Sequence, residues 1–196
     1  MSTPIDPRGR RAFDELLADR KGQLEEPRYA GQVAAIVAAL VSAFRSGNKV
    51  LWFGNGGSAA DAQHLAAEFS GRFLRERKGL PSEALTVNTS AVTAISNDFG
   101  YEHLFARMVE ALAKPGDVVI GITTSGTSKN VVRGLEAAKA AGATTVAFSG
   151  NGGGPVAEIA DFSLIGPNGY SAIVQEVHIT MGHIICDLVE QELIFA

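Results

Sequence analysis

The sequence predicts an α/β protein in which one five-stranded parallel sheet lies between helices, a Rossmann-like three-layer sandwich with N-terminal helices. From residue 49 onward, short runs rich in Val, Ile and Phe recur with little alternation of polar and apolar residues, as in strands covered on both faces. A turn and a helix-like run follow each of them, which favours a parallel sheet. The runs are KVLWFG (49–54), EALTV (83–87), DVVIGIT (117–123), TTVAFSG (144–150) and FSLIG (162–166).

Length and composition indicate one domain over residues 1–196. A chain of 196 residues that is 46% hydrophobic and 19% charged suits a single soluble core. No apolar run approaches the roughly 18 residues of a membrane span. The charged N-terminus lacks the apolar centre of a secretion signal, and Cys186, the only cysteine, can form no internal disulfide. We therefore expect a cytoplasmic protein that does not enter a membrane.

The charge distribution argues against a nucleic-acid surface. The formal net charge is −4, and the densest basic stretch is RFLRERK at 72–78. We expect this stretch to be a solvated helix end and loop.

Apolar residues at helical spacing predict helices at both ends of the chain, over Arg8 to Lys21, Pro27 to Ser46 and Ser171 to Phe195. Pro27 stands where a helix can begin. The helix that follows it is apolar around more than one face, so it is expected to pack against more than its own domain. Residues 1–46 are therefore assigned to oligomer contacts, and residues 47–196 to the sheet core and the final helix.

In a parallel α/β sheet, ligands bind beyond the carboxyl ends of the strands. Four segments are candidates there: Gly54 to Ser58, Asn88 to Asp98, Thr123 to Ser128 and Gly150 to Gly154. The first matches G-x-G-x-x-A, but no acidic residue follows about 20 positions later to hold a ribose, so a dinucleotide cofactor is disfavoured. The triphosphate-binding motif G-x-x-x-x-G-K-[ST] is absent.

The glycine loop itself has two interpretations. Its glycines let backbone N–H groups converge at the positive end of the following helix, which suits an anion, but they equally suit a tight strand-to-helix turn. Ser58, with Asp61 three residues later, is also typical of a capping box at the helix start.

The stretch TTSGTSKN at 123–130 favours a phosphate site more strongly. Four hydroxyl residues surround Gly126 at a strand-to-helix junction, where ordinary capping would explain only one or two of them. They are Thr123, Thr124, Ser125 and Ser128.

His64 and Glu68 would share one helical face, about 6 Å apart along the axis. Such a pair is often only a surface hydrogen bond, but small residues flank this one near the ligand-binding end. In the final helix Gln175, Glu176, His178 and His183 interrupt an apolar pattern, and polar groups in a packed helix need partners. His178 and Cys186 can also be core residues, and His103 is expected at the surface.

Several separated motifs resemble one family in order and spacing, from about residue 30 to the end. GNGGSAADAQHLAAEFSGRF, LTVNTSAVTAISNDFGYEHLFARMVEAL, PGDVVIGITTSGTSKNVV and VQEVHITMGHIICDLVE together resemble the phosphoheptose isomerases of the sugar isomerase (SIS) domain superfamily. That family converts D-sedoheptulose 7-phosphate to D-glycero-D-manno-heptose 7-phosphate on the route to activated heptose for surface polysaccharides such as lipopolysaccharide. Its members are zinc-binding homotetramers, and the resemblance implies a SIS-type fold, zinc and active sites near subunit interfaces.

The resemblance also assigns roles to residues. It implies catalysis by Glu68 and His183 and metal binding by His64, Glu68, Gln175 and His183. The implied substrate contacts are Asn55, Gly56, Gly57, Ser58, Glu68, Asn97, Asp98, Thr123, Thr124, Ser125, Ser128 and Gln175. Ile173 and Val174 precede Gln175 where the family often carries arginine, which puts substrate detail in doubt.

The chemistry suits these residue types. Interconverting a ketose and an aldose requires a base beside the carbonyl, stabilisation of an enediolate and return of a proton to the neighbouring carbon. Glu68 is expected to be the base and His183 the partner acid, with zinc polarising oxygens. A metal-bound carboxylate is a poorer base, so the two roles of Glu68 conflict.

One straight helix would separate Gln175 and His183 by about 12 Å along its axis, too far for one ion. We therefore expect either a helix break near Gln175 or a site completed by a neighbouring subunit.

Two other functions remain open. One is a non-catalytic SIS regulator that binds the replication initiator protein or a phosphosugar, although such initiator-binding relatives lack the residues matching Glu68 and His183. The other is a SIS isomerase for a shorter phosphosugar.

Overall fold

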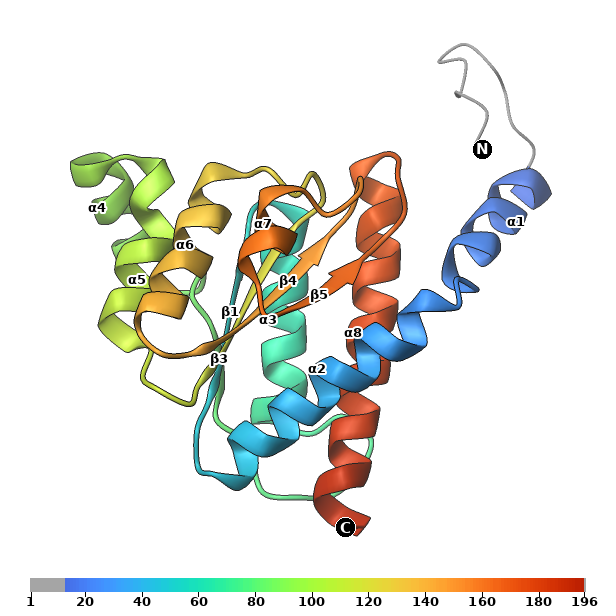
Figure 1. Ribbon diagram of the computed structural model, residues 1–196, viewed down its shortest axis with the longest axis horizontal. Coiled ribbons are helices and arrows are strands. Elements are labelled where there is room, and N and C mark those ends of the chain that lie inside the picture. The colour runs from blue at the N-terminus through green and yellow to red at the C-terminus, as the bar shows by residue number, and fades with distance from the viewer. Residues whose placement is uncertain (1–12, 196) are drawn as a thin grey trace.

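The computed structural model describes residues 13–195, and the predicted start of the first helix at Arg8 lies outside them. Within that range the chain forms a parallel five-stranded sheet with helices on both faces (Figure 1), which confirms the predicted class. The strands are β1 (Val50–Gly54), β2 (Ser82–Ala84), β3 (Val118–Thr123), β4 (Thr144–Ser149) and β5 (Phe162–Ile165). The helices are α1 (Phe13–Leu24), α2 (Arg28–Arg45), α3 (Gly57–Ser70), α4 (Thr89–Phe99), the 3₁₀ turn η1 (Tyr101–His103), α5 (Leu104–Leu112), α6 (Lys129–Ala140), α7 (Gly154–Ile159) and α8 (Ser171–Phe195).

The strand order is β2-β1-β3-β4-β5, and every neighbouring pair is parallel. The chain therefore winds outward in opposite directions from β1 and β3, which makes the gap between these two strands the topological switch point. β2 is shorter than the apolar run EALTV. β2 has only three residues, and all three pair with β1. Such short strands are common at the edge of a sheet.

Two apolar cores cover the two faces of the sheet. One consists of residues from α2, α3 and α8 around Trp52 and Phe148. The other consists of residues from α5, α6 and α7 around Phe53 and Phe105. Because all five residues of β1 are buried, its run can be apolar throughout, as predicted for a strand between two helical layers.

The long final helix has the predicted bounds, Ser171–Phe195, and is continuous. It packs against α2 and α3, with Val177, Met181 and Ile185 buried. By length and composition alone α8 is apolar enough to cross a membrane, contrary to the expectation that no run approaches that length. Half of that stretch is buried inside the protein.

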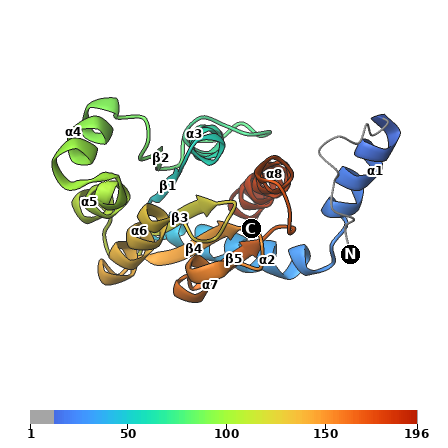
Figure 2. The ribbon, with the colours of Figure 1, turned by 90° about the horizontal axis from the view of Figure 1, so that it is seen from above.

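Helix α1 projects from the rest of the molecule in both overall views (Figures 1 and 2). None of its residues is buried, and Phe13 and Leu17 are exposed. An ion pair between Arg20 and Glu176 connects it to α8.

Candidate active site

The loops after β1 and β3 flank the switch point and place their polar residues at its mouth. After β1, Gly56 has φ +57°, a conformation that L side chains rarely adopt, and no atom lies within 4 Å of where its Cβ would be. Gly56 is the N-cap of α3, and Gly57 is its first residue. The loop is therefore open at Gly56, whereas the amides of Ser58 and Ala59 already donate to the carbonyl oxygens of Asn55 and Gly56, each at 3.0 Å.

The structure does not form the capping box predicted from Ser58 and Asp61. α3 begins two residues earlier than that motif requires, with Gly56 rather than Ser58 as its N-cap, and no side chain caps it. Ser58 is instead 3% exposed in the first turn. Asp61 has one buried carboxylate oxygen without a hydrogen-bond partner among the described residues. Burial raises the pKa of Asp61 to about 6, although nearby His64 lowers it.

Asn55 is held by two residues that sequence reasoning did not select. Its side-chain amide and that of buried Asn130 exchange two hydrogen bonds, at 2.9 and 2.8 Å. The Tyr101 hydroxyl also donates to Asn55 Oδ1, at 2.7 Å. Because Asn130 lies in the first turn of α6, this pair joins the loops on the two sides of the switch point.

The loop after β3 gathers three of the four predicted phosphate-binding hydroxyls. Thr123 Oγ1 lies 2.9 Å from Ser128 Oγ and 3.3 Å from Ser125 Oγ. Thr124 turns toward α8, where its hydroxyl meets that of Ser171. Ser128 is the N-cap of α6, but its side chain bonds no N–H of the helix. Hydroxyls and helix amides therefore converge at one position, in an arrangement suited to a phosphate.

Gly126 fixes the shape of this hydroxyl loop. Its φ is +72°, and a Cβ there would lie 2.2 Å from the carbonyl oxygen of Gly153. The amide of Val156 donates to the Gly126 carbonyl. The loops after β3 and β4 are thus packed backbone to backbone.

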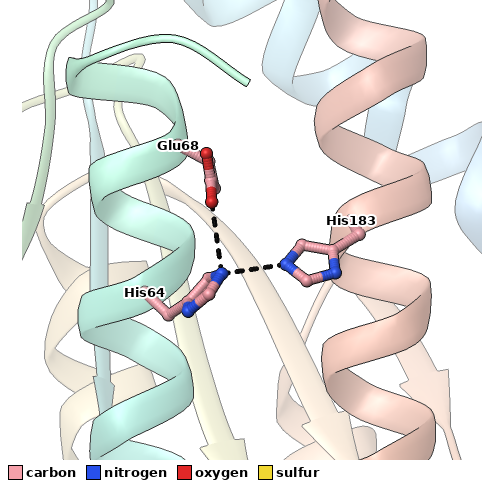
Figure 3. Close-up of side chains that lie close together, drawn as sticks. All are labelled: His64, Glu68 and His183. Atoms are coloured by element: carbon pink, nitrogen blue, oxygen red, sulfur yellow. Dashed lines mark hydrogen bonds and ion pairs between the residues drawn. The ribbon is translucent and has the colours of Figure 1, made fainter. Parts of the chain in front are cut away.

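His64 and Glu68 on α3 meet His183 on α8 (Figure 3). His64 Nε2 lies 3.2 Å from a Glu68 carboxylate oxygen and 2.9 Å from His183 Nε2. The three potential ligand atoms all lie within 4.8 Å of one another, and two imidazoles with a carboxylate form a set that Zn²⁺ prefers. These residues therefore fit a metal ion.

The surroundings of His183 favour its neutral form. Burial and the nearby His64 lower the pKa of His183, while Glu68 raises it. On its other side, the Phe73 ring stacks on the imidazole, with ring centres 5.4 Å apart and planes inclined by 20°. A neutral imidazole is the form that binds a metal.

Gln175 lies at the opposite end of the site from this cluster. Its amide packs over Gly57, where a Cβ would come within 2.5 Å of Gln175 Nε2. The predicted helix break near Gln175 is wrong, because α8 runs unbroken through Gln175 and His183. The other alternative, completion of the site by a neighbouring subunit, remains a prediction, as does metal binding by Gln175.

Asn97 and Asp98 lie on α4, at the outer edge of the molecule (Figure 1). Both are exposed, and their side chains bond to each other at 2.8 Å. None of the α4 residues is buried. The helix leads directly into η1, whose Tyr101 reaches Asn55, and this is the connection of α4 to the switch-point loop.

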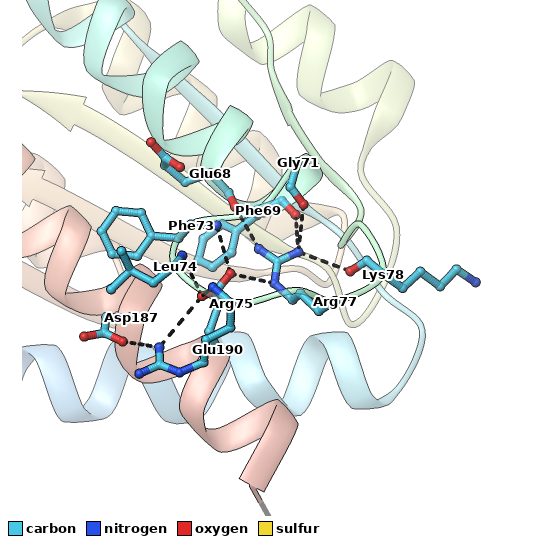
Figure 4. Close-up of polar contacts among 10 residues, drawn as sticks. All are labelled: Glu68, Phe69, Gly71, Phe73, Leu74, Arg75, Arg77, Lys78, Asp187 and Glu190. Atoms are coloured by element: carbon cyan, nitrogen blue, oxygen red, sulfur yellow. Dashed lines mark hydrogen bonds and ion pairs between the residues drawn. The ribbon is translucent and has the colours of Figure 1, made fainter.

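The basic stretch 72–78 lies in the loop after α3, as predicted, but it is only partly solvated. The Arg77 side chain is 7% exposed and pairs with the fully buried Glu190 of α8 (Figure 4). The charge pattern alone predicted a solvated face because the partner carboxylate is 113 residues away in the chain.

His178 is a core residue, as the alternative interpretation held. It is fully buried, and its Nε2 lies 2.9 Å from the Ser149 carbonyl oxygen. Burial lowers its pKa to about 4, against a raising effect of that hydrogen bond. Cys186 is likewise buried, and His103 is exposed in η1.

An open parallel sheet with hydroxyl-rich and glycine-rich loops at its switch point defines an α/β protein that binds small phosphorylated ligands. Comparison with known proteins makes this class specific. The family model described as "SIS domain" matches residues 18–150. The chain therefore belongs to the SIS domain family, and within it to the phosphoheptose isomerases, as the following relatives show.

A phosphoheptose isomerase from Roseiflexus sp. is 51% identical over 195 residues, which are 98% of both chains. One from Aquifex aeolicus is 56% identical over 163 residues, 83% of this chain and 85% of that protein. Among solved structures, the phosphoheptose isomerase of Neisseria gonorrhoeae superimposes with a TM-score of 0.83 at 36% identity, covering 92% of this chain and 100% of the other.

Proposed function

We propose that this protein is an aldose-ketose isomerase that converts D-sedoheptulose 7-phosphate to D-glycero-D-manno-heptose 7-phosphate. The observation that carries the proposal is the meeting of Glu68, His64 and His183 in a chain that also has a loop of phosphate-type hydroxyls and is 51% identical to a phosphoheptose isomerase over 98% of its length. Each part of that arrangement has a task in the reaction.

The hydroxyl loop and the α6 N-terminus would hold the phosphate and so fix the position of the sugar carbons. Thr123, Ser125 and Ser128 supply the hydroxyls. Asn55, held rigidly by Asn130, offers an oriented amide to sugar oxygens near the start of α3. Binding at the loop would place C1 and C2 toward α3 and α8.

Glu68 would remove a proton from C1, beside the C2 carbonyl, to give an enediolate, and the same proton or its equivalent would return to C2. His183 would serve as the partner acid, giving a proton to O2 and taking up the proton that O1 releases as the C1 aldehyde forms. His64, Glu68 and His183 would hold a zinc ion, and because α8 is unbroken a Gln175 ligand to it would come from a neighbouring subunit, which leaves Gln175 of the same chain as a substrate contact. Such an ion supplies Lewis-acid polarisation of the carbonyl and hydroxyl oxygens.

We further propose a cytoplasmic homotetramer with active sites near subunit interfaces, whose product enters activated-heptose synthesis for lipopolysaccharide and related polysaccharides. The projecting α1 and an apolar groove between α2 and α8, lined by Ala34, Ala38, Val41 and Leu188, support the oligomer. Apolar surface of this kind is what subunit contacts cover.

The test is to incubate the purified protein with sedoheptulose 7-phosphate and to follow aldose formation, with and without a zinc chelator. We expect turnover by the parent, loss on chelation and a fall of about 10²- to 10⁴-fold for Glu68→Gln, the range for a general base. Glu110→Gln, an exposed glutamate on α5, is the control. Metal content of Glu68→Gln separates its roles, because a base-only role leaves zinc bound.

The opposite result would be absence of turnover on any ketose phosphate, with Glu68→Gln indistinguishable from the parent. That result would favour the non-catalytic regulator. Turnover of a shorter ketose phosphate in preference to the heptulose would instead favour an isomerase of another substrate range.

A further inference from the structure

Glu190 is a fully buried carboxylate on α8 that receives four hydrogen bonds from one surface segment. The backbone amides of Phe73, Leu74 and Arg75 each donate to it at 2.9 Å. The Arg77 Nε also donates, at 2.9 Å. We call residues 71–81, which connect α3 to β2, the strap. A buried charge with this many donors is satisfied, so it fixes the strap on α8.

Arg77 extends the attachment from the strap to the end of α3. Its Nη2 donates to the carbonyl oxygen of Glu68 at 2.7 Å, and its Nη1 donates to that of Phe69 at 2.8 Å. These carbonyls belong to the last turn of α3, where a helix leaves acceptors unsatisfied. One guanidinium therefore joins the backbone of Glu68 to the carboxylate of Glu190 (Figure 4).

The same segment reaches His183. Phe73, whose amide is held by Glu190, stacks its ring on the His183 imidazole. His183 and Glu190 lie about two turns apart on the same face of α8. A continuous series of contacts therefore connects the two helices. Arg77 bonds the end of α3 and Glu190, Glu190 bonds the amide of Phe73, and the Phe73 ring stacks on His183.

We propose that Arg77 and Glu190 are positioning residues that clamp the end of α3 to α8 and thereby fix Glu68 and His64 opposite His183. Neither side chain contacts the Glu68 carboxylate or the His183 imidazole directly. Arg77 acts through the Glu68 backbone, and Glu190 acts through Phe73. The inference rests on the proposed function for its kinetic readout, and metal binding provides a readout that does not depend on turnover.

The state of Glu190 is consistent with a charged clamp. Burial by itself would raise the pKa of Glu190, but the three strap amides and Arg77 hold it below its usual value. The neighbouring Arg75 and Asp187 side chains are about a third exposed, and Arg75 Nη1 also lies 3.8 Å from a Glu190 carboxylate oxygen, whereas Figure 4 draws no interaction of the Asp187 side chain with Glu190 or with α3. Asp187 is therefore a matched surface acid one turn from Glu190.

The experiment measures two properties of the parent and of each variant. One is Co²⁺ binding to the metal-free protein, followed by visible absorption, and the other is kcat and KM on sedoheptulose 7-phosphate. Glu190→Gln keeps the shape but replaces one acceptor with a donor. Arg77→Lys keeps the charge but cannot reach Glu190 and both carbonyls at once. We expect each to weaken Co²⁺ binding and to lower kcat by about tenfold or more, the usual effect of losing a group that orients metal ligands, with little change in KM.

Two controls separate positioning from stability. Asp117→Asn alters another buried carboxylate, which accepts from the amides of Lys49 and Lys114 just before the amino end of the central strand β3. It should lower the Tm and leave Co²⁺ binding and kcat unchanged. Asp187→Asn should change none of the three.

Parent-like Co²⁺ affinity and kcat in folded Glu190→Gln and Arg77→Lys, whatever their Tm, would overturn the proposal. If Glu190→Gln does not fold, Arg77→Lys decides. Absence of turnover in the parent would contradict the proposed function but not the clamp, which then stands or falls on Co²⁺ binding alone.

Discussion

His64 and His183 face each other Nε2 to Nε2 at 2.9 Å, although 119 residues separate them in the chain. Two imidazole nitrogens this close can share one proton or one ion, but both cannot be charged at low cost. The carboxylate of Glu68 beside them favours a cation between the rings. The pair is therefore the most direct indicator of a metal in this fold.

Replacing His64 should remove the metal. We expect His64→Asn to retain much less zinc than the parent after dialysis, as measured by elemental analysis of the folded protein, because three ligands become two. His103→Asn, in an exposed histidine on η1, should keep the parent's zinc content. Equal zinc in all three proteins would contradict the assignment.

Acid should destabilise the protein through His178. Its pKa is about 4 in the fold and about 6.5 when unfolded, so between these values the unfolded chain binds the proton that the folded chain does not. Stability is complete above pH 6.5 and falls as the pH drops toward 4, by roughly 3 kcal/mol from this group. Urea unfolding across that pH window measures the slope. His178→Gln should flatten it, and an unchanged slope would refute this account.

A methyl group at Gly57 should displace Gln175 without unfolding the protein. The added Cβ would meet the flexible end of Gln175 rather than backbone, so Gly57→Ala should keep a Tm close to that of the parent. Its activity should fall if Gln175 contacts substrate or metal. Gly31→Ala, where no atom lies within 4 Å of the new Cβ, is the matched control for activity. Full activity of Gly57→Ala would exclude a role for that position of Gln175.

Removing a hydroxyl from the loop after β3 should weaken substrate binding rather than chemistry. Ser128→Ala should raise KM by about tenfold, the cost of one hydrogen bond to a charged group, with kcat almost unchanged. Steady-state kinetics give both values. Ser163→Ala on the edge strand β5 should behave as the parent does. A fall in kcat at constant KM would place the phosphate elsewhere.

A charge in the groove between α2 and α8 should disrupt subunit contacts. Ala38 lines that groove, and burying a glutamate there in an interface is costly. Ala38→Glu should therefore shift the protein from a tetramer to smaller species in light scattering after gel filtration. A parent that is itself monomeric, or a variant that remains tetrameric, would contradict this use of the groove.

The sequence predicted the features that depend on neighbouring residues. Strands β1, β3 and β4 and the whole of α8 follow from local periodicity, and the hydroxyl loop follows from composition at a strand end. The start of α3 was predicted wrongly because Gly56, at φ +57°, provides the N-cap through its backbone, which a side-chain motif does not reveal.

The missed residues have distant partners. Asn130 bonds Asn55 across 75 residues, and Glu190 bonds Phe73 across 117. Local spacing carries no signal for such pairs. An acidic residue in the last turns of an apolar helix was the one clue to Glu190. His183 was selected as a polar residue within that apolar pattern, and its catalytic role came from the resemblance to a family.

α8 runs unbroken through Gln175, His183 and Glu190, so the number of residues between these positions fixes which way each side chain points. One residue inserted between His183 and Glu190 would turn the latter by about 100° around the axis, away from the loop that it anchors. Length variants should therefore be tolerated poorly along this helix.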